Sequence, residues 1–522
     1  MSFWFIAFST FILSILIYYL VKFATKSSSS SSSLPLPPGP KPWPIIGNMP
    51  HLGSAPHQSL AALAQTYGPL MHLKLGFVDV IVAASADVAE QFLKVHDANF
   101  ISRPPNVGAK HMVYNYQDLV FAPYGPRWRL LRKISSVHLF SNKVMAEFQN
   151  LREEEAGRLT SNLASNYSDT KAVNLGQVLN VCTTNALARV MLGRRVFNDE
   201  NGGNDPKADD FKDMILELMV LGGVFNISDF IPSLEWLDLQ GVQAKMKILH
   251  KKFDAFLTNI IEEHESSNSK REKHKDLLTT LLALRDEGDD DGNKLNITEV
   301  KALLLNMFAA GTDTSSSTTE WAIAELIKNP KILAKVQQEL DNVVGRDRNV
   351  KEEDIPNLPY LQAVIKETFR LHPSTPLSLP RIASESCEIF GYHIPKGATV
   401  LVNVWAIARE PKKWVDPLVF NPERFLPGGD KCDVDIKGND FEVIPFGAGR
   451  RICVGMSLGL RMVQLLTATL AHSFNWELEN GLRVENMNMD EAFGITLQRD
   501  VPLSVYPKPR LSPNVYSSCF RM

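Results

Sequence analysis

The chain has 522 residues, with 55 Lys and Arg against 58 Asp and Glu, which gives a formal net charge of −3. This balance argues against nucleic acid as a partner, because no strong positive footprint is present. Hydrophobic residues make up 44% and charged residues 22%, a composition typical of a globular chain with a large core. Five cysteines lie far apart without any CxxC pair, which argues against a disulfide framework or a structural zinc site.

The first predicted element is a membrane-spanning helix over residues 2–21, an uncharged apolar stretch long enough to cross a bilayer. A cleaved signal peptide is the alternative, but the stretch lacks a basic start and a small-residue cleavage pattern. Lys22 and Lys26 follow the stretch and place the remaining chain on the cytosolic face. We therefore predict three parts, a membrane anchor, a Ser- and Pro-rich linker and one large folded domain, over residues 1–22, 23–50 and 51–522.

Hydrophobic periodicity predicts a mainly α body with a small β component. The alternation in residues 70–84 indicates two short strands around Gly76. Most of the chain from there to about residue 379 has the pattern of helices. Strand-like pieces return at residues 382–390 and 399–404.

The longest predicted helix covers residues 296–328. Asn296 and Glu299 have the spacing of an amino-terminal cap pair, and an Asn-Pro pair at residues 329–330 ends the segment. Midway, small residues are followed by an acid and a hydroxyl in the run Ala309-Ala310-Gly311-Thr312-Asp313-Thr314-Ser315. Taken alone, this run is compatible either with close helix packing at the glycine or with a functional site.

A cysteine-containing loop is the most informative segment, with the sequence Phe446-Gly447-Ala448-Gly449-Arg450-Arg451-Ile452-Cys453-Val454-Gly455. It precedes an apolar periodic run at residues 456–474, so Cys453 lies before a helix amino terminus, where backbone N–H groups and the charge of Arg451 favour a thiolate. Gly449 and Gly455 permit close approach of the backbone to a flat ligand. A buried structural cysteine is the alternative for Cys453 taken alone.

The pattern F-x-x-G-x-R-x-C-x-G in this loop resembles the haem-ligand loop of the cytochrome P-450 monooxygenases. The resemblance implies the mainly α cytochrome P-450 fold, and haem b with an axial thiolate from Cys453. It also implies further contacts to the haem and its propionates, from Phe446, Gly449, Arg451 and Gly455 in the loop, from Trp128 and Arg132, and from Arg381.

Two further motifs resemble those of the same family. The run from Ala310 to Ser315 matches A-G-x-D-T-S, which implies that Thr314 assists dioxygen activation and that Asp313 relays protons for O–O cleavage. The pattern E-x-x-R at Glu367 and Arg370, followed by Arg424, matches a triad that holds the haem-binding fold.

Three stretches, residues 223–232, 310–318 and 424–429, resemble the plant flavonoid B-ring hydroxylases. This resemblance implies hydroxylation at the B-ring 3′ position of flavanones, dihydroflavonols, flavonols or flavones, with O₂ and NADPH-derived electrons. Thr496 is typical of the 3′-hydroxylases, whereas the 3′,5′-hydroxylases usually carry a smaller residue there. Further substrate contacts are expected at Ala310 and Leu377.

Electron supply and location follow from the same resemblance. The chain has no flavin or dinucleotide fingerprint, which predicts a separate NADPH-cytochrome P-450 reductase as partner. We expect a single-pass protein of the endoplasmic reticulum membrane with its catalytic domain in the cytosol. Flavonoid 3′,5′-hydroxylation, or another plant phenylpropanoid-type oxidation, is the alternative activity. A haem-thiolate sensor without catalysis is a remote one, because a sensor does not need the Asp313 and Thr314 pair.

Overall fold

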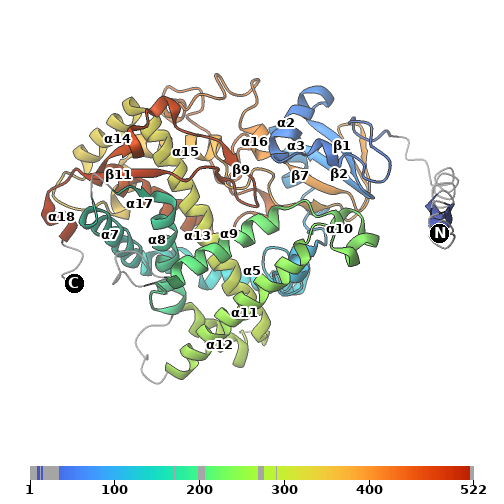
Figure 1. The fold of residues 1–522 in the computed structure, drawn as a ribbon, viewed down its shortest axis with the longest axis horizontal. Helices are drawn as coiled ribbons and strands as arrows, with labels where there is room; N and C mark the ends of the chain where they lie inside the picture. Colours follow the sequence, from blue (N-terminus) through green and yellow to red (C-terminus); the bar gives the residue numbers. More distant parts are fainter. Residues whose placement is uncertain are drawn as a thin grey trace.

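The computed structural model describes residues 9–11, 13–15, 34–167, 171–197, 206–267, 276–289 and 291–517. Within these residues most of the body is helical, and a small sheet lies at the amino-terminal end (Figure 1). The longer helices are α2 (Pro56–Tyr67), α5 (Pro126–His138), α7 (Gln149–Ser165), α8 (Leu175–Leu192), α9 (Pro206–Gly223), α11 (Val242–Ser267), α12 (Leu277–Asp286), α13 (Ile297–Lys328), α14 (Pro330–Val343), α15 (Pro359–Leu371) and α17 (Met456–Ser473).

Short helical pieces connect these elements. They are η1 (Met49–His51), α3 (Ala86–Glu90), η2 (Gln91–Val95), α4 (Val107–His111), α6 (Asn142–Glu147), α10 (Ile227–Phe230), η3 (Pro232–Leu237), η5 (Glu352–Asn357), α16 (Val404–Ile407), η6 (Pro422–Phe425), η7 (Gly449–Arg451), η8 (Glu479–Gly481), η9 (Val484–Asn486) and α18 (Pro513–Ser517). The mainly α fold with a small β component is therefore confirmed.

Helix α13 crosses the middle of the helical body (Figure 1). Its start is fixed by a capping box, in which the Asn296 side chain accepts from the Glu299 N–H and the Glu299 carboxylate accepts from the Asn296 N–H. The helix ends at Asn329, and Pro330 begins α14. The predicted central helix and both of its ends are thus confirmed.

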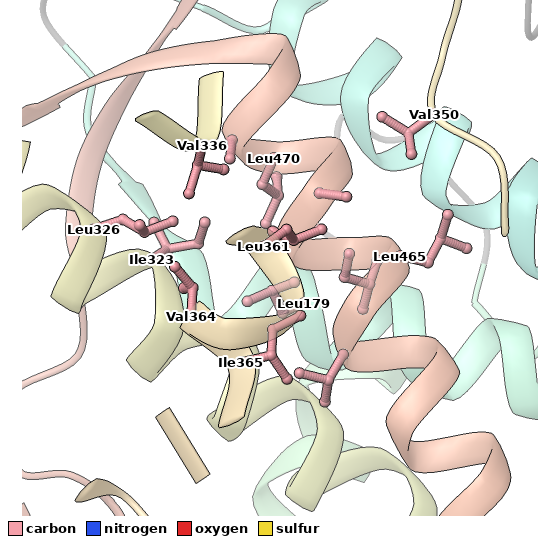
Figure 2. Packing of buried hydrophobic residues seen from close by; sticks show 14 of the residues in the cluster. Leu179, Ile323, Leu326, Val336, Val350, Leu361, Val364, Ile365, Leu465 and Leu470 are labelled. Carbon is pink, nitrogen blue, oxygen red and sulfur yellow. The ribbon is translucent and has the colours of Figure 1, made fainter. Parts of the chain in front are cut away.

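A core of aliphatic side chains joins α13 to its neighbours α8, α14, α15 and α17. Figure 2 shows labelled members of this cluster, namely Leu179, Ile323, Leu326, Val336, Val350, Leu361, Val364, Ile365, Leu465 and Leu470. All of them are buried, and each buried side chain of this size stabilises the folded state by about 1.5–3 kcal/mol. This packing holds α13, α15 and α17 against one another.

The amino-terminal sheet has the strand order β1-β2-β7-β4. Strand β1 (Leu70–Leu75) pairs antiparallel with β2 (Val78–Ala83), β2 pairs parallel with β7 (Thr399–Val402), and β4 (Arg381–Ile382) closes the edge. These pairs confirm the strands predicted around Gly76 and near residues 382 and 399. The proline-rich segment before them lies on the sheet, since the carbonyl of Pro38 accepts from the His72 N–H at 2.9 Å.

Smaller sheets complete the β component. Strands β5 (Cys387–Ile389) and β6 (Tyr392–Ile394) form a hairpin. Near the carboxyl end, β11 (Ser504–Pro509) pairs with β3 (Val173–Asn174) and β8 (Phe474–Leu478), and β10 (Gln498–Arg499) pairs with β9 (Glu491–Ala492). The last two strands border the loop that contains Thr496.

The predicted membrane helix at residues 2–21 falls largely outside the described residues. Among the residues that the structure does describe, no helix combines the length and the apolar character that crossing a membrane requires.

Candidate active site

A cavity of about 320 Å³ lies between α13 and the cysteine loop. Its wall brings together residues that the sequence analysis selected from distant parts of the chain, namely Trp128, Arg132, Ala310, Thr314, Arg381, Phe446, Arg451, Cys453, Gly455 and Thr496. The predicted motifs therefore converge on one enclosed space.

Cys453 occupies the wall opposite α13, in the loop that leads into α17. Its side chain lies deep in the fold but is open to the cavity, and its N–H donates to the Phe446 carbonyl at 2.9 Å. Burial raises the pKa of the thiol, while the N–H of Gly455 and the charge of Arg132 lower it. The cation that supports a thiolate is thus Arg132, whereas the sequence indicated Arg451.

Gly449 and Gly455 of the loop have different surroundings. Gly455 lines the cavity, and a Cβ there would lie 3.9 Å from the Cys453 Sγ. Gly449 has a φ of +71°, and a Cβ there would lie 2.1 Å from the Leu93 carbonyl oxygen. The segment around η2 thus requires glycine at position 449, and the expected contact of Gly449 with the ligand stays a prediction.

A cluster of guanidinium groups borders one side of the cavity. Arg451 stacks over the Trp128 ring at 4.2 Å and donates to the carbonyls of Ile101, Leu119 and Ala122. Arg381 pairs with Asp97 at 2.9 Å, and its buried Nε has no hydrogen-bond partner within the described chain. Such an orphaned cationic donor beside a cavity favours an anionic ligand.

Arg103 is a member of this cluster that the sequence analysis missed. It donates to the carbonyls of Val120, Leu379 and Pro380, and it lines the cavity. Burial and the charges of Arg381 and Arg451 lower its pKa well below the ordinary value. No motif marks Arg103 in the sequence, since its position beside the others arises only in the fold.

The acidic groups beside these arginines are few. Asp97 pairs with Arg381, and the buried Asp118 accepts from the N–H groups of Val120 and Phe121. Burial raises the pKa of Asp118 to about 6. The cavity wall thus contains four guanidinium groups, those of Arg103, Arg132, Arg381 and Arg451. Among the described residues beside them, the carboxylates of Asp97 and Asp118 are fewer than these cations. Two propionate carboxylates fit this imbalance.

Helix α13 provides the opposite wall. Ala310 and Thr314 open onto the cavity, and the Thr314 hydroxyl donates to the Ala310 carbonyl at 2.6 Å. Asp313, the residue before Thr314, is buried, and its carboxylate accepts from the Thr496 hydroxyl at 2.5 Å and from the Gln498 side chain at 2.8 Å. Burial raises the pKa of Asp313, and these two hydrogen bonds oppose the rise.

A second cavity of about 370 Å³ adjoins the first and shares Arg103, Ser378 and Ile495 with it. Leu377 lines this second cavity and packs in the cluster of the β1–β2 sheet. Leu377 thus lies on the second cavity rather than the first, and its expected contact with the substrate stays a prediction. The chain turns at Ser378, whose φ is +54°. Ser378 and Leu379 reach the first cavity instead.

The structure also brings together the three residues of the predicted triad. Arg370 donates to both oxygens of Glu367 at 2.7 and 2.8 Å, and the Nε of Arg424 donates to the same carboxylate at 3.2 Å. All three side chains are buried. They join α15 to η6, away from the cavity wall.

Another buried carboxylate, Glu491, was not selected from the sequence. It accepts from Trp405 and Gln58, bonds to His57 at 2.9 Å and lies 3.6 Å from Arg409. These partners hold its pKa at about 2, although burial alone would raise it. The cluster fastens β9 to α2 and α16, and β9 precedes the loop of Thr496. Nothing in the local sequence indicates it, since its partners Trp405 and His57 lie 86 and 434 residues away in the chain.

Comparisons with known proteins agree with this geometry. Residues 37–502 match the family model described as Cytochrome P450. The chain is 69% identical over 477 residues to the flavonoid 3′-monooxygenase of Petunia hybrida and 66% identical over 476 residues to that of Arabidopsis thaliana, covering 91% of this chain and 92% of each relative. A zebra fish cytochrome P450 structure with abiraterone superposes with a TM-score of 0.71 at 27% identity, over 87% of this chain and 100% of that one.

The chain therefore belongs to the cytochrome P450 family, and it is a haem-thiolate monooxygenase. The thiolate ligand of the haem comes from cysteine, and a separate reductase supplies the electrons. The residues present fit this group: a sulfur open to the cavity, a cationic side wall and a glycine beside the sulfur. When bound, the haem provides the binding and activation of dioxygen.

Proposed function

We propose that this protein is a flavonoid 3′-monooxygenase, which hydroxylates the B-ring 3′ position of flavanones, dihydroflavonols, flavonols or flavones. The observation that carries the proposal is the identity of 58–69% to four relatives named flavonoid 3′-monooxygenase. Relatives named flavonoid 3′,5′-hydroxylase are 49–53% identical. The cavity, with Cys453 on one wall and Ala310 and Thr314 on the other, supports this activity.

Each site residue has a role in this proposal. Cys453 is the haem ligand, and Trp128, Arg103, Arg132, Arg381 and Arg451 hold the propionates. The Thr314 hydroxyl assists the activation of dioxygen in the cavity. Asp313 is the acid that supplies the protons for O–O cleavage. Ala310 permits the substrate ring to lie close to α13, since its side chain is only a methyl group.

Membrane attachment is also part of the proposal, together with NADPH as electron source and the endoplasmic reticulum as location. Large apolar side chains are exposed near the turn between β1 and β2, with Trp43 61%, Trp236 81% and Leu239 59% exposed. The N–H of Phe77 in this turn donates to the Phe230 carbonyl, which brings the segments together. Exposed tryptophan and leucine side chains are typical of surfaces that enter the membrane interface.

Product analysis tests the activity. Membranes that contain the protein, a plant reductase and NADPH should convert a flavanone with a single 4′-hydroxyl to the product with one additional 3′-hydroxyl. Accumulation of the 3′,5′ product would instead identify a 3′,5′-hydroxylase. A folded holoprotein without any oxygenated flavonoid product would contradict the flavonoid assignment while leaving the family unchanged.

Replacement of Thr314 tests the role of α13. Thr314→Ala should keep the carbon monoxide difference spectrum of the reduced protein, because Cys453 is unaffected. The yield of product per NADPH should fall about tenfold or more, with peroxide formed instead, since a positioned proton-transfer group contributes about 10²–10⁴-fold. An unchanged yield would contradict the role given to Thr314.

A further inference from the structure

Thr496 contacts two parts of the site at once. Its side chain lines the cavity, and its hydroxyl donates to the Oδ2 of the buried Asp313 at 2.5 Å. Gln498 donates to the other oxygen, Oδ1, at 2.8 Å. Both oxygens of the acid are therefore held by neutral donors from the carboxyl-terminal loop, 183 and 185 residues away in the sequence.

The backbone on either side of Thr496 is fixed. The N–H of Leu497 donates to the Ser374 carbonyl at 2.8 Å, and the Leu497 carbonyl accepts from Ser317 on α13 at 3.0 Å. The N–H of Ile495 donates to the Met219 carbonyl at 3.0 Å. These bonds join the loop to three other segments, so the Thr496 hydroxyl is held at a constant place beside Asp313.

We propose that Thr496 is a positioning residue for Asp313, and that it sets the orientation of this acid in addition to shaping the substrate cavity. The inference rests on the proposed function, in which Asp313 supplies protons. A hydroxyl group and a methyl group on one side chain then have separate tasks. The hydroxyl, together with Gln498, determines where the carboxylate lies, and the methyl occupies space beside the substrate.

Two substitutions separate these tasks. Thr496→Val keeps approximately the shape of the side chain and removes the hydroxyl, whereas Thr496→Ser keeps the hydroxyl and removes the methyl. Thr469→Val is the matched control, since Thr469 is buried on α17 and lies outside the cavity wall. All three variants should show the carbon monoxide spectrum of the folded holoprotein.

The expected result is a different response in each variant. Thr496→Val should form about tenfold less product per NADPH and more peroxide, the size expected for the loss of one hydrogen bond. Thr496→Ser should stay within about twofold of the wild type in this ratio and should form more of the 3′,5′ product. Thr469→Val should match the wild type in both respects.

Infrared spectroscopy provides a readout that does not depend on turnover. The carboxyl band that Asp313→Asn removes should shift in Thr496→Val and should keep its position in Thr496→Ser. If the band and the yield are the same in the valine and serine variants, the inference is wrong. If the band shifts but no flavonoid is hydroxylated even by the wild type, the proposed function fails while the contact between Thr496 and Asp313 stands.

Discussion

Two buried carboxylates of this protein, Glu367 in the scaffold and Asp313 beside the cavity, have opposite surroundings. Glu367 is held by the guanidinium groups of Arg370 and Arg424, so its negative charge is matched by cations. Among the described residues, Asp313 accepts side-chain hydrogen bonds from the neutral donors Thr496 and Gln498, and burial raises its pKa. The charge of Glu367 is thus balanced by its two arginine partners, whereas no cation of the described chain offsets the effect of burial on the pKa of Asp313.

The largest expected effect comes from removing Arg370, the main cation that pairs with the buried Glu367. Arg370→Met should cost about 3–5 kcal/mol of folding free energy, because it leaves a buried charge without its main partner. The variant should retain little haem-bound protein after mild heating, as measured by the carbon monoxide spectrum.

The control for this substitution is Arg346→Met. Arg346 is exposed and pairs with Asp341 at 2.6 Å on the surface. Exposed pairs contribute about 0–1 kcal/mol, so this variant should resemble the wild type. Similar losses of folding free energy in Arg370→Met and Arg346→Met would show that burial does not determine how much the Glu367 pair contributes to stability.

Glu491 has surroundings intermediate between those of Glu367 and Asp313, because its partners include His57, Arg409 and neutral donors. Its pKa is held at about 2, below the ordinary 4.5, so the ionised carboxylate stabilises the folded state above pH 4.5. Glu491→Gln should therefore lower the free energy of unfolding by about 3 kcal/mol at neutral pH.

The same substitution has a pH dependence of known sign. As the pH falls from 4.5 toward 2, the wild type loses the contribution of Glu491, and the difference between wild type and variant should shrink. Urea unfolding at about pH 7 and about pH 3 measures this change. A difference that grows in acid would contradict the assigned pKa.

The smallest effect is expected at Gln498, which holds the second oxygen of Asp313. Gln498→Leu should lower the product formed per NADPH by about threefold, less than Thr496→Val, because the Thr496 bond remains. Gln337→Leu, on α14, is a suitable control because Gln337 bonds to the backbone of Ala471 and Phe474 away from the cavity. If Gln498→Leu lowered the product formed per NADPH more than Thr496→Val, Gln498 and not Thr496 would be the more important partner of Asp313.

Local sequence rules predicted the elements that carry the site. The cap pair at Asn296 and Glu299 marked the start of α13, and the apolar periodic run from residue 456 marked α17. The predicted strands around Gly76 also formed. These features depend on residues within a few positions of one another, so the sequence contains the whole cause.

The contacts within the site depend on the fold. The sequence alone determined that Cys453 lies at a helix amino terminus and that an acid and a hydroxyl interrupt a long helix. Only the tertiary structure decided that Arg132 is the cation beside Cys453, that Leu377 faces the second cavity, and that Thr496 holds Asp313. The physical reason is that these side chains come from segments far apart in the chain, and packing of the core decides which of them meet.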